Sequence, residues 1–193
     1  MALRPIKDVR REELAQAALE VFLAEGADGM TLDRVAKTAG ASKGIVLHYY
    51  TSKEALLDRV LRDVMRVLGQ EARAALLPAQ TARTRAEAQI SLCFRPELFT
   101  PPYARAWLSV ITKCPENKQL NRYRRLLQRR LRSNLRASLR PLVGATEARP
   151  VADSLIALMD GLWLRRAIDP DAMTPDRAAA LAQTHLEESL AFL

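Results

Sequence analysis

The stretch from Thr31 to Lys53 constrains the fold of this chain most, because it contains two short helical segments separated by a glycine turn. Thr31 and Ser42 stand where helix N-caps are expected, since each hydroxyl can accept a hydrogen bond from a free N–H of the first turn. Gly40 lies between them, where a left-handed residue ends the first helix. Helix, glycine-containing turn and helix make the helix-turn-helix unit, whose second helix enters the major groove of DNA. The sequence therefore predicts binding to double-stranded DNA, with a reading helix at about residues 43–48.

The composition favours an all-α protein of the cytoplasm. Of the 193 residues, 49 % are hydrophobic, only 5 % are aromatic and 7 are Gly, and the good helix formers Leu, Ala, Arg and Glu dominate. No apolar run reaches the roughly 18 residues of a membrane span, and the N-terminus lacks the apolar stretch of a signal peptide, so no membrane partner is expected. The two cysteines, Cys93 and Cys114, are expected to be buried and reduced.

Apolar stripes at helical spacing, separated by Gly, Pro and capping residues, divide the chain into nine expected helices. They cover about residues 7–24, 32–39, 43–48, 52–77, 84–93, 101–114, 117–139, 147–168 and 175–191. A T-S-K-E sequence at residues 51–54 reads as a capping box that opens the fourth helix. The chain thus divides into an N-terminal three-helix DNA-binding domain, residues 1–53, and a larger helical domain, residues 54–193.

The net charge of +8 does not mark the DNA-binding segment. Acidic and basic residues balance over residues 1–60, whereas residues 113–140 carry ten Lys or Arg against one acid, Glu116. This basic helix is interpreted either as a solvated face or as the site of a second, acidic partner.

The N-terminal quarter resembles the TetR family of bacterial repressors. The matching segments are AQAALEVF at residues 15–22, Gly26, residues 31–40 and 42–50, and Lys53 to Leu57. The resemblance implies an all-helical homodimer. Its N-terminal helices would bind a palindromic operator, and its C-terminal region would bind a small-molecule effector and dimerise.

Ten residues around the turn are candidate DNA contacts. They are Thr31, Ser42, Lys43, Gly44, Val46, Leu47, His48, Tyr49, Tyr50 and Lys53. Lys43 can reach a guanine or a phosphate, and Gly44 lets the backbone approach the groove wall. Val46 or Leu47 is expected to touch a thymine methyl, whereas Ile45 is expected to pack inward. One of the two tyrosine hydroxyls is expected on a phosphate with the other ring in the core, and Lys53 is expected to neutralise a phosphate.

Part of the C-terminal region resembles the BetI-type subgroup of that family, which includes the choline-responsive repressor of glycine betaine synthesis. The matching segments are residues 106–108, 129–135 and ALMDGLWLR at 157–165. Val110 and Ile111 depart from the pattern, because choline-responsive members carry further aromatic residues there. The resemblance implies a small organic effector, with a quaternary ammonium compound as the candidate.

Four residues are the candidate effector contacts: Tyr103, Trp107, Asp160 and Trp163. Three aromatic rings and a carboxylate could enclose a cation by cation–π attraction. The alternative is that the aromatic residues are ordinary helix-bundle core. No metal and no cofactor is expected, because the two histidines, His48 and His185, have no ligands at suitable spacing and no phosphate-binding loop occurs.

The last two expected helices are the candidate dimer interface. Their apolar stripes are Val151, Leu155, Leu158 and Leu162 on one helix and Ala182, Leu186 and Leu190 on the other. Such a pair from each subunit would make a four-helix bundle. Two other functions stay open: a ligand-independent DNA-binding helical protein, and a helical enzyme, although no catalytic motif is present.

Overall fold

The computed structural model describes residues 5–191, so the outer ends of both predicted domains, residues 1–4 and 192–193, lie outside the described part. The helices are α1 (Ile6–Gly29), α2 (Leu32–Thr38), α3 (Lys43–Tyr49), α4 (Lys53–Leu76), α5 (Ala82–Cys93), α6 (Pro101–Lys113), α7 (Lys118–Ile168) and α8 (Pro175–Ala191). No strand occurs between residues 5 and 191, and the predicted all-α class is confirmed. In the same part of the chain, no helix is both long and apolar enough to cross a bilayer.

The turn between α2 and α3 is formed by local hydrogen bonds. Gly40 has φ +58, and its N–H donates to the carbonyl of Lys37 at 3.2 Å. The next N–H, of Ala41, donates to the carbonyl of Ala36 at 2.8 Å. This pair of bonds is the Schellman motif, which favours glycine in the left-handed position. The predicted helix-ending role of Gly40 is therefore confirmed.

Hydroxyl caps open five of the first six helices, at Thr31, Ser42, Ser52, Thr81 and Thr100. Thr31 Oγ1 accepts from Arg34 N–H, and Ser42 Oγ accepts from Ile45 N–H, both at 3.3 Å. Thr100 caps α6, whose first residue is a proline. At α4 the prediction was wrong by one residue: Ser52, and not Thr51, is the cap, and its Oγ accepts from Ala55 N–H at 3.1 Å.

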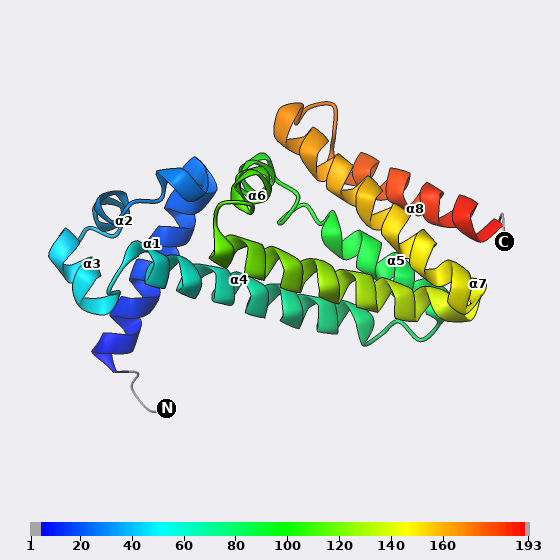
Figure 1. The fold of residues 1–193 in the computed structure, drawn as a ribbon, viewed down its shortest axis with the longest axis horizontal. Coiled ribbons are helices and arrows are strands. Elements are labelled where there is room, and N and C mark those ends of the chain that lie inside the picture. The colour runs from blue at the N-terminus through cyan, green and yellow to red at the C-terminus, as the bar shows by residue number, and fades with distance from the viewer. Residues whose placement is uncertain (1–4, 192–193) are drawn as a thin grey trace.

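The buried side chains form two clusters with α6 on the boundary between them. The first joins α1, α2 and α3 to the first half of α4, to α6 and to the start of α7, through residues such as Leu14, Val35, Leu56, Val110 and Leu120. The second lies among α5, the rest of α7 and α8. Figure 1 shows α1–α3 at one end of an elongated molecule; α4 runs from that end and α7 from beside α6 toward the other end, and α6 lies between α1–α3 and the helices α5 and α8. The N-terminal helices thus share their core with the C-terminal region.

Helix α7 consists of two arms. Gly144 has φ +83 and ψ 170, which breaks the helical path, so the second arm returns across the first and packs on α8. In Figure 1 this reversal lies at the end of the molecule far from α1–α3. The predicted break between the basic helix and its successor is present, although Pro141 lies within the helix and does not end it. We call residues 118–143 the first arm and residues 145–168 the second arm.

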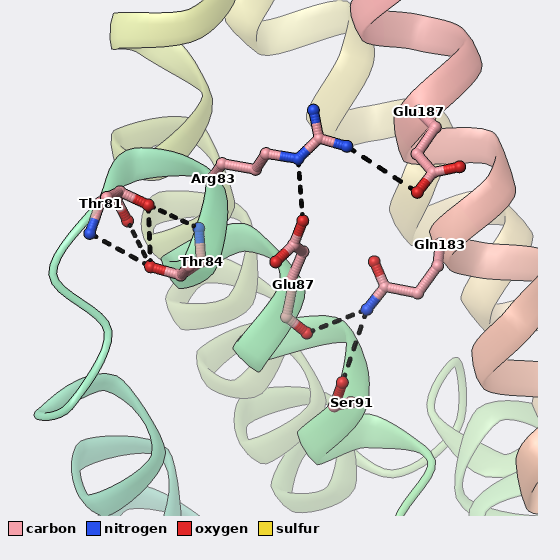
Figure 2. Close-up of polar contacts among 7 residues, drawn as sticks. All are labelled: Thr81, Arg83, Thr84, Glu87, Ser91, Gln183 and Glu187. Carbon is pink, nitrogen blue, oxygen red and sulfur yellow. Dashed lines mark hydrogen bonds and ion pairs between the residues drawn. The ribbon is translucent and has the colours of Figure 1, made fainter.

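Polar contacts tie α8 to α5, as Figure 2 shows. Gln183 Nε2 donates to the carbonyl of Glu87 at 3.2 Å and to Ser91 Oγ at 3.5 Å. Arg83 forms an ion pair with Glu87 at 3.0 Å and approaches Glu187 at 3.8 Å. These contacts fix α8 on its own protomer and orient its opposite face outward.

The apolar stripes predicted for the dimer interface lie inside the protomer. Val151, Leu155, Leu162, Ala182 and Leu186 are buried members of the second cluster, and Leu158 and Leu190 pack against it. The assignment of the five buried residues to an interface is therefore wrong, whereas for the half-buried Leu158 and Leu190 it stays a prediction. These buried residues cover α5 and the end of the first arm of α7, in the same cluster as Ala86, Ile90, Leu135 and Leu139.

Candidate nucleic-acid interface and ligand cavity

Helix α3 presents an exposed face at the end of the molecule. We call this the reading face: Ser42, Lys43, Gly44, Ile45, Leu47 and His48, all exposed. The cap at Ser42 starts the helix, and its hydroxyl accepts the N–H of Ile45, so the N–H groups of Lys43 and Gly44 at the exposed start of the helix have no intrahelical acceptor. A helix with an exposed N-terminal turn and a basic side chain is suited to phosphate and base-edge contacts in a major groove.

Lys43 is held by an acidic neighbour. Its Nζ lies 2.8 Å from Asp33 Oδ2 on α2, and both side chains are more than half exposed. Such an exposed pair contributes little to stability, and Lys43 stays accessible to an external phosphate or base. Thr31, at the start of α2, is also exposed, with its hydroxyl engaged in the cap.

Val46 and Ile45 occupy the reverse of the predicted orientation. Val46 is fully buried in the first core cluster, whereas Ile45 is 40 % and Leu47 42 % exposed. The cause is the spacing of core positions, since Val46 and Tyr50 lie four residues apart and both face inward. Val46 as a base contact is wrong, and Ile45 is an exposed apolar residue that the sequence analysis missed.

Of the two tyrosines, Tyr50 is the core residue. Its ring is buried, its hydroxyl donates to the carbonyl of Arg11 at 2.9 Å, and burial raises its pKa. Tyr50 is therefore not a phosphate contact. Tyr49 is half-buried, with its ring edge-on to His48 at 5.1 Å between centroids. Arg11 NH2 donates to the Tyr49 carbonyl at 3.4 Å, which ties the end of α3 to α1.

Lys53 lies at the start of α4 and faces the junction of α1, α6 and α7. Its Nζ donates to the carbonyl of Asp28 at 3.5 Å. Together with Asp28, Lys113 and Glu116 it lines a cavity of about 220 Å³. A phosphate contact by Lys53 stays a prediction, and it would require the side chain to leave this junction.

A larger cavity of about 520 Å³ lies between α6 and the two arms of α7. Apolar side chains from α6 and the second arm line it, among them Leu108, Ile111 and Leu164. Polar groups come from both arms: Asp160 from the second, and Asn121, Arg124 and Gln128 from the first. Apolar walls with a few converging polar groups are typical of small-molecule sites.

Asp160 is the acidic group of this cavity. Within residues 5–191 its carboxylate has no hydrogen bond and no ion pair. Burial raises the pKa of Asp160, and the charge of Arg124 lowers it by a smaller amount. A half-buried carboxylate has lost part of its hydration. A bound cationic ligand would stabilise its charged form again, so this site favours a cation.

The three aromatic residues predicted beside Asp160 are not among the residues that line this cavity. Trp163 packs edge-on against Phe99, with 5.0 Å between ring centroids, on the other side of the second arm. Trp107 packs against the first core cluster, and Tyr103 is half-buried in the first turn of α6. The predicted enclosure of a cation by Asp160 and the rings of Tyr103, Trp107 and Trp163 is therefore not formed at this cavity. The cavity is lined instead by Asn121, Arg124 and Gln128. Sequence analysis did not identify these residues as ligand contacts, because they lie in the predicted basic helix.

Helix α6 lines the cavity and also contacts the last turn of α1, which belongs to the DNA-binding end. Ser109 of α6, next to the lining residue Leu108, accepts a hydrogen bond from Ala27 N–H at 3.3 Å. Lys113, one turn further, pairs with Asp28 at 2.9 Å. These two contacts join α6 to the last turn of α1.

Two family models of the TetR type match this chain, one in the N-terminal region and one in the C-terminal region. The family model described as "Bacterial regulatory proteins, tetR family" matches residues 14–60, and that described as "BetI-type transcriptional repressor, C-terminal" matches residues 82–191. The HTH-type transcriptional regulator BetI of Rhizobium meliloti (strain 1021) is 34 % identical over 185 residues, which span 96 % of this chain and 91 % of that protein. BetI 1 of Chromohalobacter salexigens is also 34 % identical, over 96 % of this chain and 93 % of its own length.

Solved structures share the fold over nearly the whole chain. A transcriptional regulator from Pseudomonas aeruginosa PAO1 has a TM-score of 0.81 at 27 % identity, covering 97 % of this chain and 93 % of its own. A regulator from Saccharomonospora viridis, solved in complex with choline, has a TM-score of 0.81 at 20 % identity, covering 93 % and 96 %. At that identity the second likeness concerns the fold alone.

Proposed function

This chain belongs to the TetR family of bacterial regulatory proteins, with a BetI-type C-terminal region, and on that premise we propose that it releases its operator when a small organic cation enters the cavity at Asp160. The family makes the chain a ligand-responsive, DNA-binding transcriptional repressor. One observation supports both the location of the site and the positive charge of the effector. The Asp160 carboxylate lines a 520 Å³ cavity and has no hydrogen-bond or ion-pair partner in the described chain. Its site of action would be the cytoplasm, where the operator lies.

The reading face enters the major groove in this proposal. Lys43 exchanges Asp33 for a guanine or a phosphate, and Gly44 permits close approach of the backbone. Ile45 and Leu47 are the exposed apolar groups that can meet thymine methyls. Thr31, Ser42, His48 and Tyr49 lie at the edges of this face and are proposed to position it on phosphates.

The route from ligand to DNA runs through α6. Leu108, Ile111 and Cys114 line the cavity, while Ser109 and Lys113 of the same helix bond to the last turn of α1. A cation drawn to Asp160 must displace α6 relative to the second arm if it enlarges the cavity. That displacement shifts α1 and the reading face together, because both share the first core cluster. The ligand acts only to the extent that it binds the displaced state better.

A homodimer provides the two reading faces that a palindromic operator needs, about 34 Å apart. The outward side of the second arm carries a stripe at alternating spacings of three and four residues, which we call the outer stripe: Ser154, Ala157, Gly161, Leu164 and Ile168, all exposed. Leu164 and Ile168 are 43 % and 68 % exposed, and Leu181 of α8 is 43 % exposed. Small residues with flanking apolar ones permit close helix packing, so the outer stripe is the proposed dimer contact, in place of the stripes predicted from the sequence. Gly161 and Leu164 also line the cavity, so this contact would border the ligand site.

The test combines one DNA-binding assay with two acidic variants. Fluorescence anisotropy with labelled DNA from upstream of the protein's own gene measures operator affinity, with and without choline or tetramethylammonium. We expect the cation to weaken operator binding by the wild type and by Asp171→Asn, which changes an exposed acid of the α7–α8 loop. Asp160→Asn should bind the operator normally and lose the response.

Four outcomes would contradict the proposal or favour an alternative to it. If Asp160→Asn responds as the wild type does, the effector binds elsewhere. If Lys43→Ala binds operator as tightly as the wild type, the reading face is misplaced, since loss of such a contact should cost roughly 1–3 kcal/mol. Operator binding that no cation changes would favour the ligand-independent protein. Conversion of the added compound, followed by chromatography, would favour the enzyme.

A further inference from the structure

The ligand cavity contains a second, opposite charge that a simple cation leaves unused. Arg124 of the first arm and Asp160 of the second line the same cavity, yet no ion pair joins them in the described structure. We propose that the effector is a zwitterion, with a cationic group bound by Asp160 and a carboxylate or comparable anionic group bound by Arg124. This inference rests on the proposed function, in which the cavity is the effector site.

The guanidinium of Arg124 is held in place by neutral groups. NH1 donates to Gln128 Oε1 at 2.6 Å and NH2 donates to Asn121 Oδ1 at 3.1 Å. Both acceptors are amide oxygens of the same helix, and all three side chains line the cavity. Because a guanidinium has five N–H donors, further donors remain for an anion, and the planar group suits the two oxygens of a carboxylate. The positive charge is thus oriented but not neutralised.

Electrostatics favour a ligand with both charges over a ligand with one. A cation near Asp160 is attracted by the carboxylate but repelled by Arg124, which already acts on Asp160 through space. A simple anion is attracted by Arg124 but repelled by the Asp160 carboxylate. Apolar side chains of Leu108, Ile111 and Leu164 line the same cavity as the two charged groups. A zwitterion makes both contacts favourable.

Arg124 differs from its basic neighbours in this respect. Arg122, Arg125 and Arg129 are exposed, whereas Arg124 is half-buried and faces the cavity. Arg125 has no hydrogen bond or ion pair in the described part of the chain, so it supplies a matched control on the same helix.

Four probes of nearly equal shape separate the charges. Trimethylglycine carries both charges, choline only the cation, 3,3-dimethylbutanoate only the anion, and 3,3-dimethylbutan-1-ol neither. Calorimetric titration of the full-length protein gives each affinity. We expect the wild type and Arg125→Gln to bind trimethylglycine at least tenfold more tightly than choline or the carboxylate.

The variants then assign each charge. Arg124→Gln should lower the affinity for trimethylglycine at least tenfold and leave choline binding unchanged or tighter. Asp160→Asn should weaken both compounds that carry the cation. Thermal unfolding checks that each variant is folded. Should Arg124→Gln not fold, Arg124→Lys replaces it, because it keeps the charge and loses the paired donors, and a fall in trimethylglycine affinity with choline unchanged is then expected.

The inference and the proposed function fail differently. Tighter binding of choline than of trimethylglycine, unaffected by either Arg124 variant but lost in Asp160→Asn, would overturn the zwitterion and keep the cation site. Equal binding of the cationic and neutral probes by wild type and Asp160→Asn would overturn both.

Discussion

The N–H of Ala27 donates a hydrogen bond to Ser109 Oγ at 3.3 Å, where the last turn of α1 meets α6. The two helices are in close contact here, because a Cβ placed at Gly26 would lie 3.0 Å from the Cβ of Ser109. Gly26 also has φ +72, a conformation that favours glycine. Ser109 Oγ in turn donates to the carbonyl of Ala106 at 2.7 Å. This contact connects a helix of the cavity to a helix of the DNA-binding end.

Removal of that contact should weaken communication between the two sites. Ser109→Ala leaves Ala27 N–H without its acceptor, at a cost of about 1 kcal/mol in stability. We expect effector affinity to stay near the wild-type value and the effector-induced loss of operator binding to shrink. Anisotropy titrations with and without effector measure this loss. Thr112→Ala is the control, because Thr112 bonds only to carbonyls of its own helix, and an equal effect in both variants would contradict the assignment.

Neighbouring residues of α3 should separate DNA affinity from stability. Val46→Ala creates a cavity in the first core cluster and should lower the free energy of unfolding by about 2 kcal/mol. Ile45→Ala removes an exposed side chain, so it should leave stability within about 0.5 kcal/mol and weaken operator binding. Urea unfolding and anisotropy measure the two effects. The reverse pattern would show that α3 is rotated relative to this structure.

Local signals were sufficient to predict the elements of the DNA-binding end. Thr31 and Ser42 were predicted as caps, and Gly40 as the end of a helix, because each acts through hydrogen bonds within a few residues. The orientation of α3 was not predictable in this way. In a helix of seven residues the apolar pattern is too short to define a face, and contacts with α1 and α2 decide that Val46 packs inward.

The cavity depends on contacts between distant segments. Asp160 was singled out from the sequence, but Arg124 meets it only because the chain reverses at Gly144 and brings the two arms of α7 together. The predicted aromatic enclosure was wrong for the same reason, because the ring of Trp163 packs against Phe99 and does not line the cavity that contains Asp160. Helical spacing placed the residues on their helices and did not specify which faces meet.

The outer stripe gives a direct prediction for the dimer. Ala157→Glu places a charge in the middle of the stripe on an exposed position, so it should leave the protomer folded and raise the dimer dissociation constant at least tenfold. Sedimentation velocity at several concentrations measures this constant. Ala137→Glu, an exposed position on the first arm, is the control. A wild-type monomer at micromolar concentration, or a dimer unaffected by Ala157→Glu, would contradict the proposed contact.

A hydrogen bond between α4 and α7 should give stability a specific pH dependence. Tyr123 donates to Asp58 Oδ1 at 2.9 Å. Burial raises the pKa of Asp58, but the hydrogen bonds from Tyr123 and Gln119 and the nearby arginine charges hold it below the ordinary value of 3.8. A carboxyl group with a lowered folded pKa stabilises the protein above its unfolded pKa, and that stabilisation is lost as the pH falls through the folded pKa.

Tyr123→Phe should therefore lower the free energy of unfolding by about 1 kcal/mol at neutral pH, with a smaller difference from wild type well below pH 3.8. Urea unfolding at a series of pH values measures both. Tyr103→Phe is the control, because the Tyr103 hydroxyl has no hydrogen bond in the described part of the chain. A difference that stays constant down to low pH would show that the lost contact does not involve the charged form of Asp58.

The most direct test of operator release is the reciprocity of the two binding events. Thermodynamic linkage requires that, if the effector weakens operator binding by some factor, the operator weakens effector binding by the same factor, typically about 5- to 150-fold. Effector affinity is measured by calorimetry on the free protein and on the protein saturated with operator DNA. We predict weaker effector binding in the DNA complex, by the factor found in the anisotropy titration. Equal effector affinity in the two states would contradict the mechanism.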